Sequence, residues 1–178
     1  MWPGCANGVV EAGGVSPHPP TLANIPALAA LHAQAWRETY PGLLPEDEIA
    51  RMTDSAQLHR IWTAVLGRGD ARAVWLPGMG FAVIGPQRDA ALAAAGYPEE
   101  LWMTYLLRAA QGRGLGRALL SAVRSASAFT ALVVAGNTRA CGFYAAQGGI
   151  LLDTRTERIG TTPITERIYG WPEAVAGA

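Results

Sequence analysis

Residues 100–120 decide the fold, and they read ELWMTYLLRAAQGRGLGRALL. The stretch begins with a run of apolar and aromatic residues, which predicts a strand over Leu101–Leu107. It ends with Leu119 and Leu120, which together with Val123 just beyond it have helical spacing and predict a helix over Leu115–Ala126. Between the strand and the helix lies the turn Gln111–Gly116, in which glycine stands at every second position.

The glycine turn has the features of an anion site. Gly112, Gly114 and Gly116 lack side chains where the backbone must turn sharply, so bare N–H groups can converge on one anion. The following helix adds partial positive charge at its N-terminus, and Arg113 and Arg117 add mobile cations. We therefore expect a pyrophosphate here, although a tight strand-to-helix connection would produce the same glycines. The spacing differs from the dinucleotide-binding pattern G-x-G-x-x-G.

A second pattern follows further along the chain. Asn137, Ala140 and Tyr144 are spaced i, i+3, i+7 in a predicted helix over Thr138–Gln147, so they form one stripe on that helix. Two interpretations stay open: a stripe that faces a ligand, or an ordinary N-cap at Asn137 with a core aromatic at Tyr144.

Together the two patterns resemble the GNAT superfamily of N-acetyltransferases. Residues 100–120 look like its acyl-CoA signature, and residues 137–148, with Asn137, Ala140, Phe143-Tyr144 and Gly148, look like the motif that follows it. Segments at 35–40 and 80–86 are similar to common family segments. The resemblance covers about residues 21–171.

The sequence departs from the family pattern at two positions. Arg108 stands where the family often has Pro, and Gly149 stands where an aromatic commonly follows Gly148. We expect a surface change at Arg108, or a contact with the nucleotide phosphate. At Gly149 we expect loose packing at the start of the next strand.

The resemblance implies an architecture on the border of α/β and α+β. It has a mixed, mostly antiparallel central sheet of six to seven strands with helices on both faces, splayed where the strand holding Leu106 meets the strand holding Val133. Acetyl-CoA would be the acyl donor, with its pantetheine arm in that gap and Tyr144 near the sulfur. The implied cofactor-binding residues are Leu106, Leu107, Gln111, Gly112, Arg113, Gly114, Leu115, Gly116, Arg117, Asn137, Ala140 and Tyr144.

The remaining segments predict one domain over residues 1–178, since no repeat or long linker divides the chain. Residues 1–20, rich in Gly and Pro, are expected to be irregular or partly disordered apart from a short strand around Gly8–Val15, and His18-Pro19-Pro20 would break a regular ladder. The other expected elements are helices at Thr21–Tyr40, Glu46–Leu66 and Ala90–Ala95, and strands at Ala71–Leu76, Met79–Ile84, Ala131–Ala135, Ile150–Ile159 and Ile164–Trp171.

Composition excludes several other classes. The formal net charge is zero, whereas a nucleic-acid binder usually has a basic excess. All basic residues are Arg, so the Lys of a phosphate-binding P-loop is missing. Cys5 and Cys141 match no metal spacing, and we expect no metal site. No stretch is long and apolar enough for a membrane span, and the first residues do not read as a signal peptide, so we expect a cytoplasmic protein.

For catalysis we expect direct attack of a primary amine on the thioester, with Tyr144 as general acid toward the leaving thiolate. Glu38, Asp89, Glu99 and Glu100 are candidate bases, and a water chain is the alternative; Glu100, at the start of the central strand, is our choice. Cys141 reads as a small buried residue.

Four kinds of acceptor stay open: a small amine, an amino-acid-like metabolite, an antibiotic and a protein terminus. For the oligomeric state, a homodimer is one option. Aromatic residues would line an acceptor cleft or fill the core: Trp36, Tyr40, Trp62, Tyr97, Trp102 and Tyr105. Two rival classes are a non-catalytic acyl-CoA-binding module and an interaction domain that binds no CoA.

Overall fold

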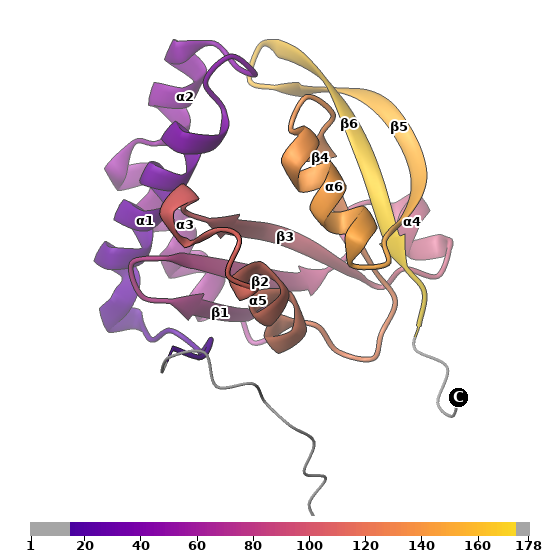
Figure 1. Ribbon diagram of the computed structural model, residues 1–178, viewed down its shortest axis with the longest axis horizontal. Helices are drawn as coiled ribbons and strands as arrows, with labels where there is room; N and C mark the ends of the chain where they lie inside the picture. Colours follow the sequence, from indigo (N-terminus) through magenta and orange to yellow (C-terminus); the bar gives the residue numbers. More distant parts are fainter. Residues whose placement is uncertain (1–14, 174–178) are drawn as a thin grey trace, which may run out of the picture.

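A computed structural model describes residues 15–173. Its centre is a six-stranded sheet in the order β1-β2-β3-β4-β6-β5, flanked by helices (Figure 1). The strands are β1 (Arg72–Leu76), β2 (Gly80–Pro86), β3 (Glu99–Leu106), β4 (Phe129–Val134), β5 (Ile150–Ile159) and β6 (Thr162–Trp171). The expected strand around Gly8–Val15 lies, except for Val15, outside the described residues. His18 forms a single bridge to Trp75 of β1, in line with the expectation that the following prolines prevent a longer ladder.

The helices are α1 (Ile25–Thr39), α2 (Glu46–Met52), α3 (Ser55–Gly67), α4 (Ala90–Ala94), α5 (Leu115–Val123) and α6 (Thr138–Ala146), with short 3-10 turns at Leu22–Asn24 and Arg108–Ala110. The single helical region expected over Glu46–Leu66 is two helices. Asp54 separates them because its side chain accepts a hydrogen bond from the Gln57 N–H at 2.8 Å, which caps α3. The helix expected to reach Ala126 ends at Val123.

The sheet is mixed, as expected. Neighbouring strands are antiparallel except for β3 and β4, which are parallel and are connected through α5. The parallel pairing covers only the residues from Glu99 to Leu101 on β3 and from Phe129 to Ala131 on β4. Beyond these residues β3 continues to Leu106 without pairing to β4, and Figure 1 shows the two strands running apart.

Each face of the sheet has its own buried cluster. The face that carries α5 and α6 buries Leu101, Leu119, Ala131, Tyr144 and Trp171, among others. The opposite face packs against α1 and α3, which contribute Leu28, Leu58 and Trp62. A third, smaller cluster joins the end of α1 and α2 to β6. Helices therefore cover both faces, and the widening gap between β3 and β4 opens between them.

The loose packing expected at Gly149 is not found. A Cβ atom added there would lie 2.6 Å from the ring of Trp171 and 2.9 Å from the Tyr144 carbonyl oxygen. The Trp171 ring stacks on Phe129 at a centroid distance of 4.6 Å, and its N–H donates to the Gln147 carbonyl at 2.9 Å. Trp171, at the end of β6, thus fills the space that an aromatic side chain after Gly148 would take.

Candidate functional site

A cavity of about 990 Å³ occupies the gap between β3 and β4. Its walls include residues 102–106 of β3 and 132–134 of β4, the segments beyond the last residues that pair between these two strands. The glycine turn and α6 close one side, and the end of α1 with Ile159 and Glu166 closes the other. The cavity therefore passes from one face of the sheet to the other.

The glycine turn has the backbone conformation that its sequence predicts. Gly112 has φ 74° and Gly114 has φ 76°, both in the left-handed region, and Gly114 is the N-cap of α5. The space beside both glycines is open, since a Cβ atom at either would meet nothing within 4 Å. The N–H groups of the first turn of α5 have no intrahelical partner. Gly112, Gly114 and Gly116 line the cavity, so this end can receive an anion.

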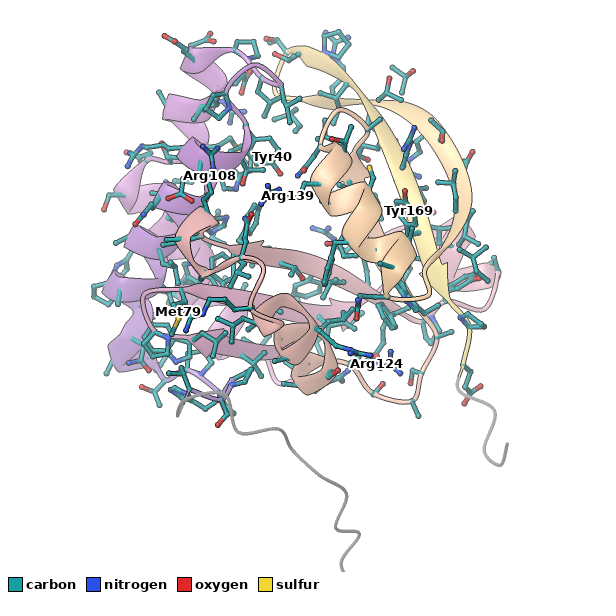
Figure 2. The ribbon with its side chains drawn as sticks, viewed as in Figure 1. Tyr40, Met79, Arg108, Arg124, Arg139 and Tyr169 are labelled. Atoms are coloured by element: carbon teal, nitrogen blue, oxygen red, sulfur yellow. The ribbon has the colours of Figure 1, made fainter. Side chains whose placement is uncertain are left out.

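Arginines gather at the same end of the cavity. Arg108, Arg117 and Arg139 line it, while Arg113 is exposed and does not. Figure 2 shows Arg108 and Arg139 around the space between α1 and α6, together with Tyr40. The Arg108 N–H donates to the Glu38 carboxylate at 2.7 Å, and its guanidinium donates to the Glu38 carbonyl at 2.8 Å. Arg108 thus ties the turn to the end of α1.

The backbone at the end of β3 leaves one amide facing the gap. The Leu107 N–H donates to the Met79 carbonyl at 2.8 Å and the Leu107 carbonyl accepts from Ala110, so both groups are occupied, and Leu107 does not line the cavity. Because neighbouring residues of a strand direct their amides to opposite edges, the Leu106 amide faces β4. The Leu106 carbonyl accepts from the Gln111 side chain at 2.8 Å. Of the expected pair, Leu106 is placed for a backbone contact and Leu107 is not.

Both interpretations of the stripe on α6 apply: its residues cap the helix and fill the core, and they also face the cavity. Asn137 caps the helix, with its side-chain oxygen accepting from the Ala140 N–H at 3.1 Å, and Tyr144 packs against Tyr169 and Trp171 in the core. All three stripe residues also line the cavity. Burial raises the pKa of the Tyr144 hydroxyl above its ordinary value of 10.0, so this group stays protonated near neutral pH.

One polar atom in the wall has no partner. The Thr104 hydroxyl of β3 is buried and has no partner at hydrogen-bonding distance within residues 15–173, although it lies near enough to the Tyr144 hydroxyl to affect the Tyr144 pKa. Thr104 pairs with Ala82 of β2 but lies on the part of β3 that does not pair with β4, and it lines the cavity. A buried hydroxyl without a partner carries a desolvation cost that a polar ligand group would remove.

The aromatic residues divide between the core and the cavity. Trp36 and Trp62 are buried among α1, α3 and the sheet. Tyr40, Trp102 and Tyr105 line the cavity on the side away from α6. The hydroxyls of Tyr40 and Tyr105 are 3.0 Å apart and form a hydrogen bond.

The expected carboxylates are mostly occupied by arginines or backbone groups. Glu99 pairs with Arg72, Asp89 pairs with Arg155, and neither lines the cavity. Hydrogen bonds from the Arg108 N–H and from Gln34 lower the pKa of Glu38, which does line it. These three side chains are therefore weak candidates for a base.

Glu100 is buried and lines the cavity, and its carboxylate is held by Arg88 from two directions. The Arg88 backbone N–H donates to it at 3.2 Å and the Arg88 Nε at 3.1 Å, while the terminal nitrogen of the same guanidinium forms an ion pair with the other oxygen. Both carboxylate oxygens of Glu100 are therefore occupied by Arg88, which leaves little room for an acceptor amine to reach them.

Glu166 of β6 is a site residue that the sequence analysis missed. It lines the cavity, and burial raises the pKa of its carboxyl above the ordinary value of 4.5. Ile164 and Ile168, two positions to either side, are buried, so Glu166 interrupts an inward-facing apolar row. This charge at an inward position of the last strand is the signal that could have identified it.

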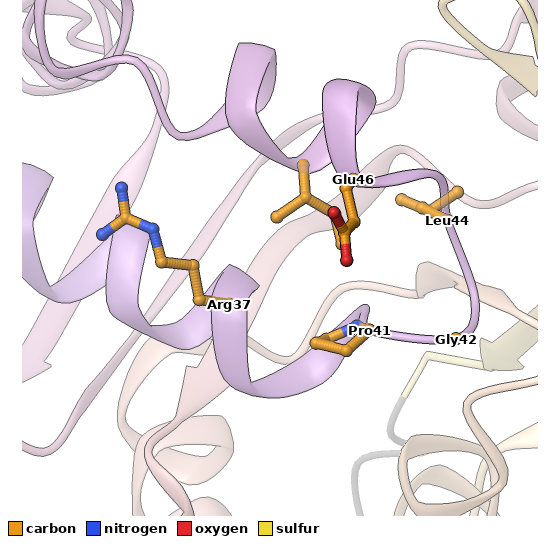
Figure 3. A pocket seen from close by; sticks show the side chains of 6 residues that line it. Arg37, Pro41, Gly42, Leu44 and Glu46 are labelled. Carbon is orange, nitrogen blue, oxygen red and sulfur yellow. The ribbon is translucent and has the colours of Figure 1, made fainter.

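A second hollow of about 210 Å³ lies between the end of α1 and α2 (Figure 3). Its lining residues are Arg37, Pro41, Gly42, Leu44, Glu46 and Ile49. None of these six residues lines the large cavity.

Within residues 15–173 no cluster of three or more His, Cys, Asp or Glu side chains could hold a metal ion. In the same residues no helix has the length and apolarity needed to cross a bilayer.

Comparisons with known proteins agree with this geometry. The model of the acetyltransferase (GNAT) family matches residues 26–148. The uncharacterized N-acetyltransferase YuaI of Bacillus subtilis (strain 168) is 32% identical over 108 residues, which are 56% of this chain and 57% of that protein. The matched segment therefore spans little more than half of that curated relative.

Solved structures share the fold. The structure of yncA from Salmonella typhimurium with its cofactor acetyl-CoA has a TM-score of 0.67 at 17% identity, covering 93% of this chain and 98% of the other. The PaiA N-acetyltransferase of Thermoplasma acidophilum in complex with coenzyme A has a TM-score of 0.62 at 17% identity, covering 86% and 98%. At this identity the similarity concerns the fold. The family match covers most of the chain, and the protein belongs to the GNAT family of acetyltransferases.

Proposed function

We propose that this protein transfers the acetyl group of acetyl-CoA to a primary amine by direct attack. The observation that supports the proposal is the single cavity between β3 and β4, which is lined by the glycine turn and also by residues from β3, β5 and β6. We call the part of this cavity lined by Tyr40, Glu100, Trp102, Ile159 and Glu166 the acceptor chamber. Acetyl-CoA supplies an activated thioester, so the protein has mainly to position two substrates and manage protons.

The residues at the turn suit the phosphates of CoA. Gly112 and Gly114 leave open space beside N–H groups at the start of α5, and Arg108, Arg117 and Arg139 supply cations around them. The Leu106 amide and the unpartnered Thr104 hydroxyl suit the polar arm of the cofactor, which would lie along β3 as an added strand does. Asn137 and Ala140 form the facing wall.

Tyr144 is the proposed donor to the departing sulfur. Its raised pKa keeps the hydroxyl protonated, so it can donate a hydrogen bond to a thiolate as negative charge develops there. A CoA-type thiol has a pKa of about 8.5, and complete proton transfer from a phenol of higher pKa is unfavourable. We therefore assign Tyr144 the role of hydrogen-bond donor, with proton transfer completed as the acceptor nitrogen loses its own proton.

Glu100, the expected base, is poorly placed to take a proton from the acceptor because Arg88 contacts both of its oxygens. In this proposal the Arg88–Glu100 pair shapes the acceptor chamber. A Glu100→Gln variant should accordingly lose less activity than a variant of an unpaired carboxylate in the same chamber.

The experiment that tests the function is thiol release from acetyl-CoA with a panel of primary amines, preceded by a thermal shift with CoA alone. A CoA shift with no thiol release for any amine would favour the non-catalytic acyl-CoA-binding module. The absence of a shift at millimolar CoA would favour the interaction domain and refute the central claim.

A further inference from the structure

The acceptor chamber contains one carboxylate that forms no ion pair among residues 15–173. We propose that Glu166 receives the ammonium group of the acceptor and takes its proton, and that the acceptor is a primary amine without a carboxylate of its own. This inference rests on the proposed function, since it names the acceptor class and one more residue of the same site.

The strand register places Glu166 in the chamber. On β6 it lies opposite Val134 of β4 and Arg155 of β5. Its inward-facing neighbours Ile164 and Ile168 are buried, and its own side chain is half-buried and lines the cavity. Within residues 15–173 it forms no hydrogen bond and no ion pair.

Charged groups face Glu166 from each element around it. They are Arg155 and Glu157 of β5, Glu100 of β3, and Arg88 of the segment between β2 and α4. Tyr40, at the end of α1, is a neutral titratable group near Glu166. Burial raises its pKa, and the negative charge of Glu166 raises it further.

Both neighbouring arginines are already engaged. Arg88 is paired with Glu100, and Arg155 contacts Asp89 at 2.6 Å and Glu157 at 3.1 Å. Burial raises the pKa of Glu166, and the charges of Arg155 and Arg88 lower it by less, but neither guanidinium forms an ion pair with Glu166. The Glu166 carboxylate therefore lacks a direct partner among residues 15–173. A half-buried carboxylate of this kind gains a charge-assisted hydrogen bond when an ammonium group enters.

The same charges disfavour a carboxylate on the acceptor. The other arginines of the cavity, Arg108, Arg117 and Arg139, lie at the turn, where the CoA phosphates are expected. An amino acid bound with its ammonium at Glu166 would place its carboxylate among acidic groups with no free cation, and like charges repel.

The rest of the chamber wall is apolar or aromatic. It includes Trp102, Tyr105, Leu132 and Ile159, together with the Tyr40 ring. Such a wall suits a hydrocarbon or aromatic body attached to the amine. 2-Phenylethylamine and L-phenylalanine form a matched pair of probes, because they differ only in the carboxylate.

The transfer balances with these groups. The ammonium gives one proton to the Glu166 carboxylate, and the neutral nitrogen attacks the thioester carbon, so a C–N bond forms and the C–S bond breaks. A second proton passes from that nitrogen to the thiolate, which Tyr144 stabilises. The products are the N-acetyl amide and the free thiol, and Glu166 releases its proton to water. Burial raises the pKa of Glu166, which makes its carboxylate a better proton acceptor.

The first test measures binding without turnover. In the presence of saturating CoA, 2-phenylethylamine should raise the Tm of the wild type, and L-phenylalanine at the same concentration should not. Glu166→Gln should bind CoA as before but weaken the amine at least 10-fold. Glu46→Gln, which makes the same change at an exposed carboxylate outside the large cavity, is the matched control and should keep wild-type amine binding.

The second test measures thiol release from acetyl-CoA. We expect kcat/KM at least 10-fold higher for the amine than for the amino acid, and a loss of at least 10-fold in Glu166→Gln that Glu46→Gln does not show. Wild-type behaviour of Glu166→Gln, a preference for L-phenylalanine, or no amine binding to the CoA complex would overturn the inference. Binding of amine through Glu166 without thiol release would sink the proposed function and leave the amine site standing.

Discussion

His32 makes the stability of this protein depend on pH. It is buried on α1 with 4% of its surface exposed, against Trp36, Trp62, Phe81 and Tyr105. Burial lowers its pKa from 6.5 to about 4, since the surrounding rings cannot solvate an imidazolium. Its Nδ1 has no hydrogen-bond partner within residues 15–173.

The sign of the effect follows from proton binding. Between pH 6.5 and about 4 the unfolded chain binds a proton at His32 and the folded chain does not, so acid favours unfolding in this window. Stability from this residue is complete above pH 6.5 and falls as the pH decreases. At about 1.4 kcal/mol for each pKa unit, the whole loss is about 3 kcal/mol, of which about 2 kcal/mol is reached at pH 5.

The assay is urea unfolding of the wild type and His32→Leu at pH 7.5, 6 and 5 and constant ionic strength. Leucine has a similar volume and does not titrate, so the difference between the two proteins isolates His32 from the carboxylates. We expect the difference to shift in favour of the variant by about 2 kcal/mol between pH 7.5 and 5. His59→Gln, at an exposed position of α3, is the control and should follow the wild type. A wild-type-to-His32→Leu difference that stays constant with pH would refute the reasoning.

Four further outcomes are expected. CoA at 100 times its Kd should stabilise the protein by about 2.7 kcal/mol in thermal unfolding, and no shift would contradict the anion site. Gly114→Ala, at φ 76°, should cost about 1–2 kcal/mol and weaken CoA binding, whereas Gly142→Ala in α6 has the same open space and should cost nothing; equal effects would show that the backbone angle is irrelevant. Tyr144→Phe should lower kcat 10-fold or more at unchanged CoA affinity, and wild-type turnover would make Tyr144 a packing residue. Gly149→Ala should lose about 1–3 kcal/mol in urea unfolding because its Cβ meets Trp171, and a neutral result would mean that the ring can move.

Most helices and strands were predictable from the sequence, because the spacing of apolar residues has one period in a helix and another in a strand. Within residues 99–123, apolar spacing predicted the strand and the helix, and the glycines predicted the turn between them. The structure confirms the turn, since Gly112 and Gly114 have positive φ values. The mixed, mostly antiparallel sheet and its opening between the strands of Leu106 and Val133 were expected from the family resemblance. The break at Asp54 was missed, since the apolar period continues across it and only a side-chain cap ends one helix and begins the next.

The candidate site was predictable only in part, because contacts between distant segments decide it. Nothing near Leu107 in the sequence shows that Met79 takes its N–H, and nothing near Glu100 shows that Arg88 occupies its oxygens. Glu166 faces the cavity because of the β4–β6 register, and a register shift on β5 between Leu151 and Asp153 sets which β5 side chains accompany it. Such pairings emerge only when the sheet is assembled.

In the proposed reaction, the division of charge inside one cavity would separate the two substrates. The chain has a formal net charge of zero, yet Arg108, Arg117 and Arg139 line the cavity near the turn, while Glu166 lines it from β6 without an ion pair among residues 15–173. The carboxylate would repel an anionic nucleotide and the arginines would repel a cationic amine, so each substrate would be directed to its own end. Thioester and amine would then meet along the part of β3 after Leu101 that does not pair with β4. This separation needs no excess charge on the protein as a whole, which is why composition alone does not reveal it.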